Sequence, residues 1–333
     1  MNTTKLNQTA LEVVSRSILA ADESSATIKK RFATINLEST PEMNRQYRQL
    51  LFTAPDIEKY VSGVILYDET IRQAADDGTP FPQLLAKKGI VPGIKVDAGV
   101  EKLPGFGNDT FTQGFDKLAR RLIEYRELGA RFAKWRAVYT IEGDKPSKLA
   151  IKRNAQDLAL YALLCQEADI VPIVEPEVLM DGENTIEVDY EVTSRVLEKV
   201  FKQLDRYGVQ LEGIILKPNM ITAGKKCADQ KGVQDVAQKT LDALKAQVPK
   251  SVPGIAFLSG GQSPDLATEH LKAINVIKSK GATEYPWRIT ASYGRALQGE
   301  TIEAWGGKTE NVGAAQTVFI ARAQKVFNAS NAQ

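Results

Sequence analysis

Residue types that often carry catalysis or metal binding are scarce in this chain of 333 residues. It has only two cysteines, Cys165 and Cys227, which lie far apart and without a CxxC partner, and its one histidine is His270. We therefore expect neither a disulfide framework nor a thiolate metal site, and a histidine-rich zinc site is excluded. Proton transfer must depend on carboxylates, lysines and tyrosines, and we expect no metal and no cofactor.

A surplus of charge of one sign and a long apolar run are also lacking. Lysine and arginine number 43 against 41 aspartates and glutamates, a formal net charge of +2. This balance does not predict a partner among nucleic acids or anionic membranes. No apolar run approaches the roughly 20 residues of a spanning helix, and residues 1–11 lack the apolar core of a secretory signal. We expect a cytoplasmic protein; a plastid location stays open for a processed mature form.

Two nucleotide-binding fingerprints are missing as well. No Gly-x-Gly-x-x-Gly follows the first predicted strand, which counts against a dinucleotide-binding doubly wound sheet. No Gly-x-x-x-x-Gly-Lys-Ser/Thr occurs anywhere. We therefore discount the similarity of Leu258-Ser259-Gly260-Gly261-Gln262 to a transport-ATPase signature.

What the chain does contain is an alternation of short apolar segments with longer helical patterns. Eight segments are typical of buried strands, namely 17–21, 63–67, 90–96, 132–138, 170–175, 213–217, 254–258 and 287–292. Helices are predicted at 7–15, 27–32, 41–50, 115–128, 147–167, 188–207, 233–247, 263–278, 296–305 and 311–327, with a glycine-rich loop at 99–114 and a polar tail at 328–333.

This alternation, over a length somewhat above the ~250 residues typical of the fold, predicts an α/β protein with a (β/α)8 barrel. A doubly wound sheet is the main alternative. No linker or shift in composition divides the chain, so we expect residues 1–333 to form one domain with an N-terminal helix and a short polar tail.

The segment 213–219 ends an apolar run on Lys217 and Pro218. Because proline cannot donate to a strand ladder, Lys217 is expected to be the last strand residue. Burial disfavours an ammonium and lowers its pKa, so this amine could act as a nucleophile. The alternative is a lysine with a buried stem and a head that reaches water.

Polar and charged residues follow the other predicted strands too. In a barrel, catalytic groups lie at the carboxyl ends of different strands. Those ends carry Asp22, Lys95, Lys134, Arg136, Glu175, Glu177, Lys217, Ser259, Ser292 and Arg295. Side chains two apart share a face, so Lys134 can point with Arg136, and Glu175 with Glu177. The alternative is a buried salt-bridge network that closes the top of the barrel.

These residue types suit one kind of chemistry. A second cation at Lys134 beside Lys217 depresses the pKa of at least one of the two amines. A free amine can form an imine with a carbonyl, and the cationic imine accepts electrons when a carbon–carbon bond breaks. Glu175 is the better-placed proton donor for imine formation, and Asp22 is free to act as the base for a substrate hydroxyl.

The loops after the seventh and eighth predicted strands indicate a phosphate site. They read Leu258-Ser259-Gly260-Gly261-Gln262-Ser263 and Ser292-Tyr293-Gly294-Arg295. Glycines leave backbone N–H groups accessible to phosphate, and Arg295 can add a charge-assisted contact. Either loop alone could be only a tight turn.

Together these segments resemble the class I fructose-bisphosphate aldolases, the metal-free Schiff-base family. Seven stretches match in family order from about residue 15 to 325: 18–24, 93–97, 132–136, 170–177, 216–220, 257–263 and 292–298. Many members of that family end in a flexible tail with a terminal tyrosine that helps exchange a proton, whereas this chain ends at 328–333 without one. Either another group does this work or the step is slow.

The resemblance implies that Lys217 forms the imine, that Glu175 is the acid and base for its formation, and that Lys134 and Asp22 take part in cleavage. Glu177 is grouped with these catalytic residues. One substrate phosphate would contact Ser259, Gly260, Gly294 and Arg295, with Ser292 nearby. The other would lie near Ser24, Thr27, Lys95 and Arg136, with Arg31 lining the cleft.

The implied reaction is the reversible cleavage of fructose 1,6-bisphosphate to dihydroxyacetone phosphate and glyceraldehyde 3-phosphate. The partners would be small sugar phosphates, and a homotetramer is implied. Two alternatives remain: a transaldolase-like or seven-carbon bisphosphate aldolase that keeps Lys217, and a catalytically idle scaffold, which predicts vacant positions on the rim.

Overall fold

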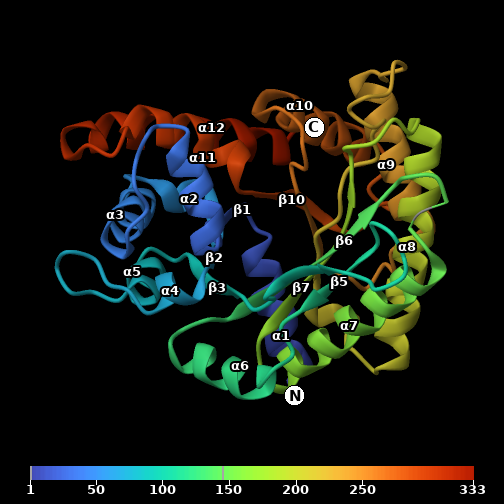
Figure 1. Ribbon diagram of the computed structural model, residues 1–333, viewed down its shortest axis with the longest axis horizontal. Helices are drawn as coiled ribbons and strands as arrows, with labels where there is room; N and C mark the ends of the chain where they lie inside the picture. Colours follow the sequence, from blue (N-terminus) through green and yellow to red (C-terminus); the bar gives the residue numbers. More distant parts are fainter. Residues whose placement is uncertain (1, 145) are drawn as a thin grey trace.

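Eight parallel strands follow one another around a closed barrel (Figure 1). The structure, a computed structural model, describes residues 2–144 and 146–333, and within them the barrel order is β1-β10-β9-β8-β7-β6-β3-β2. The strands are β1 (Ser17–Ala20), β2 (Val61–Leu66), β3 (Val91–Lys95), β6 (Phe132–Thr140), β7 (Val171–Leu179), β8 (Ile215–Leu216), β9 (Gly254–Phe257) and β10 (Arg288–Tyr293). The predicted (β/α)8 barrel is confirmed.

Helices surround the barrel and connect its strands (Figure 1). They are α1 (Thr3–Val13), α2 (Ser25–Ala33), α3 (Pro41–Phe52), α4 (Asp68–Ile71), α5 (Phe81–Lys87), α6 (Leu118–Glu127), α7 (Lys148–Glu167), α8 (Ile186–Arg206), α9 (Val233–Gln247), α10 (Pro264–Lys280), α11 (Arg295–Trp305) and α12 (Val312–Ser330). Short 3-10 turns lie at Ile57–Lys59, Leu211–Gly213 and Thr309–Asn311. The predicted start of α3 is confirmed, because Thr40 Oγ1 accepts a hydrogen bond from the N–H of Met43 at 3.1 Å. Among the described residues, no helix has the length and apolar character needed to cross a bilayer.

The lower part of the barrel interior is filled by apolar side chains. Phe132, Ile173 and Ile215 belong to one buried cluster with residues of α1, including Leu6 and Val13. Helix α1 therefore closes the amino-terminal end of the barrel. Since apolar side chains fill this end of the interior, the charged side chains of the interior gather at the carboxyl-terminal end.

Strand β7 is longer than the predicted segment 170–175, because it continues through Pro176 to Leu179. It pairs with β6 over its whole length but with β8 only at Ile173 and Val174. Beyond Val174, the N–H of Val178 faces the side where β8 has ended, where it donates to Asn219 Oδ1. By alternation the nitrogen of Pro176 faces the same side, so its missing N–H breaks no strand ladder.

Three other predictions need correction. The predicted loop 99–114 contains an antiparallel hairpin of β4 (Gly99–Lys102) and β5 (Thr110–Gln113), which threonine hydroxyls attach to β6. The predicted polar tail 328–333 is helical as far as Ser330. Strand β8 ends at Leu216, one residue before Lys217, although the N–H of Lys217 still donates to the carbonyl of Val174 at 2.8 Å.

Candidate active site

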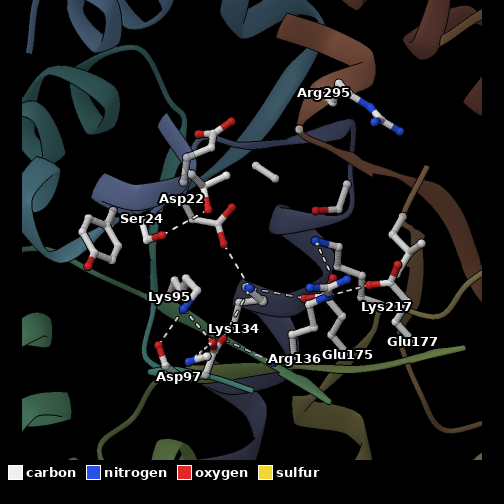
Figure 2. Close-up of a pocket in the computed structure, with 18 of the residues that line it drawn as sticks. Asp22, Ser24, Lys95, Asp97, Lys134, Arg136, Glu175, Glu177, Lys217 and Arg295 are labelled. Atoms are coloured by element: carbon white, nitrogen blue, oxygen red, sulfur yellow. Dashed lines mark hydrogen bonds and ion pairs between the residues drawn. The ribbon is translucent and has the colours of Figure 1, made fainter. Parts of the chain in front are cut away.

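A cavity of about 690 Å³ opens at the carboxyl ends of the barrel strands. Every residue predicted for the site lines it: Asp22, Ser24, Thr27, Arg31, Lys95, Lys134, Arg136, Glu175, Glu177, Lys217, Ser259, Gly260, Ser292, Gly294 and Arg295. Parallel strands bring their carboxyl ends to one rim, which explains why residues so distant in sequence meet here. Figure 2 shows most of them pointing into this space.

Lys217 lies inside the barrel and not at its surface. Its side chain is 5% exposed, and Nζ is 3.1 Å from Glu175 Oε1. The alternative of a lysine head that reaches water is therefore wrong. An amine buried beside a carboxylate has both the confinement and the proton partner that imine formation needs.

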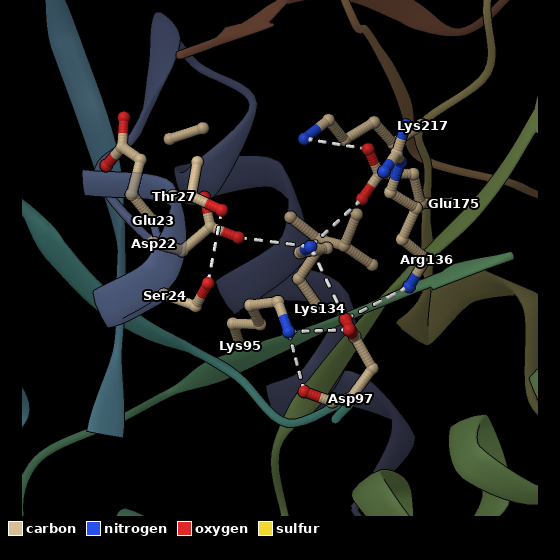
Figure 3. Close-up of polar contacts among 12 residues, drawn as sticks. Asp22, Glu23, Ser24, Thr27, Lys95, Asp97, Lys134, Arg136, Glu175 and Lys217 are labelled. Carbon is tan, nitrogen blue, oxygen red and sulfur yellow. Dashed lines mark hydrogen bonds and ion pairs between the residues drawn. The ribbon is translucent and has the colours of Figure 1, made fainter. Parts of the chain in front are cut away.

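Lys134 occupies the centre of the charged cluster (Figure 3). Its Nζ lies 3.0 Å from Asp22 Oδ2, 3.4 Å from Asp97 Oδ2 and 3.5 Å from Glu175 Oε2. Burial lowers the pKa of Lys134, but these carboxylates outweigh burial and hold the pKa well above its ordinary value. Lys134 is thus an ammonium at neutral pH, so a pKa depressed by the neighbouring cation is not found at this amine.

Two of the carboxylates around Lys134, Asp22 and Asp97, are held ionised in turn. Burial raises the pKa of Asp22, but Lys134 and Lys217 hold it below its ordinary value. Asp97 behaves in the same way beside Lys134 and Lys95, whose Nζ is 2.6 Å from Asp97 Oδ1. The cluster is therefore a fixed array of alternating charges.

Glu175 connects the two amines. One carboxylate oxygen faces Lys217, while the other faces Lys134 and accepts no hydrogen bond from the described residues. This oxygen is buried, so it retains a free lone pair for a proton from a bound molecule. Glu175 can exchange protons while it remains fixed between two cations.

One end of the cavity suits an anion. Arg295 Nη2 donates to the carbonyl of Gly260 at 3.2 Å, which ties the loop after β9 to the start of α11. Gly260 has a φ of +58°, which favours glycine. Ser292 Oγ is buried without a hydrogen-bond partner among the described residues. A free hydroxyl, a guanidinium and a helix N-terminus at Gly294 together favour a phosphate group.

The opposite end of the cavity carries a second set of donors. Ser24 Oγ and Thr27 Oγ1 lie 3.1 Å apart at the start of α2, and Lys95 lies near them in Figure 2, well away from Arg295. Arg31 on the same helix is 2.7 Å from Glu23 Oε1, and its guanidinium lies beside Gly294, between the two ends. Two anion-binding ends with the lysine cluster between them suit a molecule with two phosphates.

Several residues of the cavity were not predicted as site residues. Asp97 is one of them, although its spacing of two from Lys95 is the same signal that paired Lys134 with Arg136. Lys30 on α2 and Thr34 at its C-cap also line the cavity, three and seven residues after Thr27, a spacing that puts them on the same face as Thr27. Glu23 and Tyr67 also line the cavity, and no sequence pattern indicated them.

His270 does not line the cavity. Its Nδ1 is 2.5 Å from Gln262 Oε1, and burial lowers the pKa of His270 to about 4. The ring is neutral at physiological pH and supports the loop after β9. In the part of the chain that the structure describes, no three His, Cys, Asp or Glu side chains are grouped as a metal site.

A (β/α)8 barrel with a buried lysine, a shared carboxylate and two anion-binding ends defines a class of protein: an enzyme that uses a lysine amine on a phosphorylated substrate.

Comparisons with known proteins identify the family. The model of the family "Glycolytic: Fructose-bisphosphate aldolase class-I" matches residues 5–333. Fructose-bisphosphate aldolase of Echinococcus multilocularis is 50% identical, over 94% of this chain and 86% of that protein. Fructose-bisphosphate aldolase 2 of Caenorhabditis elegans is 48% identical, over 98% of this chain and 88% of that protein. A solved structure of fructose-bisphosphate aldolase from Plasmodium falciparum superposes with a TM-score of 0.96 and 46% identity, covering 98% of this chain and 94% of that one.

The chain therefore belongs to the class I fructose-bisphosphate aldolase family, whose members are carbon–carbon lyases. The scaffold alternative is set aside, because the family is enzymatic and the positions on the rim are occupied.

Replacing Lys134 with methionine tests the charge cluster. The variant leaves buried carboxylates without their shared cation, which costs about 3–5 kcal/mol of unfolding free energy at neutral pH. Since the pKa values of Asp22 and Asp97 are lowered by folding, the stability that Lys134 contributes is present above about pH 4 and is lost as the pH falls further. Denaturant titrations at pH 7 and at about pH 2 should show a stability deficit of Lys134→Met that is smaller at the lower pH.

The control for this variant is Lys245→Met, which breaks an exposed ion pair with Glu284. It should leave stability unchanged at both pH values. A Lys134→Met protein as stable as wild type at pH 7, or with the same deficit at both pH values, contradicts the account of the cluster.

Proposed function

We propose that this chain catalyses the reversible cleavage of fructose 1,6-bisphosphate into dihydroxyacetone phosphate and glyceraldehyde 3-phosphate through an imine at Lys217. The observation that carries the proposal is the buried Lys217 amine 3.1 Å from Glu175, whose other oxygen faces the Lys134 ammonium. Membership of the aldolase family supports it.

The first half of the reaction joins substrate to enzyme. The neutral Lys217 amine attacks the C2 carbonyl, a carbon–nitrogen bond forms, and the oxygen becomes a hydroxyl. Glu175, in its protonated form, gives a proton to that hydroxyl, which leaves as water, and the nitrogen is left as a cationic imine. Glu175 suits this step because it lies beside Lys217 and has an oxygen free of other hydrogen bonds.

The second half breaks the bond between C3 and C4. Asp22 takes the proton of the C4 hydroxyl, the C4 oxygen becomes the aldehyde, and the C3–C4 electron pair moves into the imine to give an enamine. Asp22 is ionised at neutral pH, as a base must be, and Lys134, 3.0 Å away, stabilises negative charge on the C4 oxygen as it develops. Protonation at C3 and hydrolysis then release dihydroxyacetone phosphate.

The remaining residues would bind the two phosphates of the substrate or orient the side chains that bind them. Ser259, Gly260, Ser292, Gly294 and Arg295 would take one phosphate, and Ser24, Thr27, Lys95 and Arg136 the other, with Arg31 lining the cleft. Glu177 would orient Arg136, with which it forms an ion pair.

A cytosolic location is proposed on the likeness to relatives named cytosolic or cytoplasmic in Arabidopsis thaliana and Spinacia oleracea. A homotetramer is proposed on the family resemblance alone.

Borohydride trapping tests the imine. Dihydroxyacetone phosphate and borohydride, in a buffer with EDTA, should reduce the imine to a stable secondary amine on Lys217, identified by peptide mass spectrometry. Lys217→Arg should take no label, whereas Lys225→Arg, which changes a nearby exposed lysine, should be labelled as wild type is. Label on Lys134 or another lysine overturns the assignment, and loss of activity in EDTA contradicts the metal-free mechanism.

Arg295→Ala tests the phosphate site beside α11. A hydrogen bond to a charged group contributes roughly 1.5–3 kcal/mol, so the KM for fructose 1,6-bisphosphate should rise about 10- to 100-fold while kcat changes little. Arg288→Ala, at the exposed start of the preceding strand β10, should keep both constants. An unchanged KM in Arg295→Ala would remove this residue from the site.

A further inference from the structure

The segment that follows Lys217 is irregular and yet buried. Residues 217–224 form neither helix nor strand, and all of them are buried. Buried backbone N–H groups outside regular structure need partners from elsewhere. Here two helices supply them: the N–H of Ile221 donates to Thr240 Oγ1 on α9 at 2.9 Å, and the N–H of Thr222 donates to Asp189 Oδ2 on α8 at 2.8 Å.

Asp189 also ends a chain of hydrogen bonds from β7. The N–H of Val178, next to Glu177, donates to Asn219 Oδ1 at 3.0 Å. Asn219 Nδ2 donates to Thr193 Oγ1 at 3.2 Å, and the Thr193 hydroxyl donates to Asp189 Oδ1 at 3.0 Å. From the Asn219 amide onward, each donor points toward the carboxylate, so both oxygens of Asp189 act as acceptors. Asn219 lies two residues after Lys217, so the network fixes the chain beside that lysine.

Among the residues that the structure describes, no cation forms an ion pair with this carboxylate. Asp189 is 4% exposed, and burial raises its pKa to about 7 against the lowering effect of Thr222 and Thr193. Glu187, two residues before Asp189 on α8, interacts with Lys239 of α9 and with Lys231 just before α9. Among the described residues, none of them contributes to the shift of Asp189. Burying a neutral side chain here would cost less free energy, but a neutral side chain would not offer two acceptor oxygens.

We propose that Asp189 is a positioning residue for Lys217: as a carboxylate it anchors the segment 217–224 to α8 and β7, so that the lysine amine stays beside Glu175. The proposal rests on the imine chemistry proposed for Lys217. A protonated Asp189 turns one oxygen into an O–H donor, which can bond Thr193 only if the Thr193 hydroxyl turns its own hydrogen away from the carboxyl. The hydrogen bonds of the anchor therefore keep the directions seen in the structure only when Asp189 is ionised.

The test compares Asp189→Asn with wild type between pH 5.5 and pH 8.5. At pH 5.5 wild-type Asp189 is protonated, so the two proteins should have kcat values within about twofold. At pH 8 the kcat of the variant should be lower than that of wild type by about tenfold or more. Borohydride trapping at Lys217 should also be slower in the variant. Hexitol 1,6-bisphosphate has no carbonyl and cannot form an imine. Its dissociation constant for the variant should stay within about twofold of the wild-type value. A wild-type kcat in the variant at pH 8 overturns the proposal.

Two matched variants separate positioning from general loss of structure. Thr240→Val removes the neutral anchor of the same segment, so any loss of kcat should be the same at every pH. Asp157→Asn changes another buried helical carboxyl with a raised pKa, on α7 and paired with Arg153, and should match wild type throughout. A deficit of Asp189→Asn that is equal at all pH values, as for Thr240→Val, also overturns the proposal.

The melting temperature of Asp189→Asn relative to wild type should change with pH in the direction opposite to its relative kcat. The pKa of Asp189 is raised from 3.8 to about 7 by folding, so wild type loses stability as the pH rises through this range, and the variant does not. The melting temperature of the variant relative to wild type should therefore rise with pH while its relative kcat falls. If Asp189 had only a structural role, the melting temperature and the kcat of the variant would change with pH in the same direction. If wild type itself fails to trap substrate on Lys217, the proposed function fails; if only the variant's behaviour differs from expectation, this inference alone fails.

Discussion

One carboxylate shared by two buried amines, Glu175 between Lys134 and Lys217, is the interaction on which the site depends. Lys134 is fixed as an ammonium because Asp22 and Asp97 also face it. That fixed cation holds Glu175, and Glu175 in turn faces the amine of Lys217. The array separates the roles of two chemically identical side chains: one lysine supplies a permanent charge, and the other can supply a nucleophile.

The barrel supports this buried charge cluster because its interior is divided into two layers. On β6 the inward residue Phe132 packs in the apolar layer, and Lys134 follows two residues later at the rim. On β7 and β8 the same step leads from Ile173 to Glu175 and from Ile215 to Lys217. Each of these three strands thus buries an apolar side chain below and presents a charged one above, so the packed apolar layer supports the charged layer.

Most of this design could be predicted from the sequence, because strand ends that carry charge are a local pattern. The continuation of β7 past Pro176, the hairpin within residues 99–114 and the helical end of α12 could not, since each depends on a neighbour in space. Glu23 is a further example: it holds Arg31 through a contact with no fixed spacing in sequence. Asp189 was equally hidden, because a carboxylate in a helical pattern usually faces solvent.

The rate of imine formation in Glu175→Gln tests the central claim most directly. Glutamine keeps the shape of the side chain but cannot exchange the proton, so the rate constant measured by rapid-quench borohydride trapping should fall by about 10²- to 10⁴-fold, while hexitol 1,6-bisphosphate still binds. An imine that forms on Lys217 at the wild-type rate in this variant would contradict the role of the shared carboxylate.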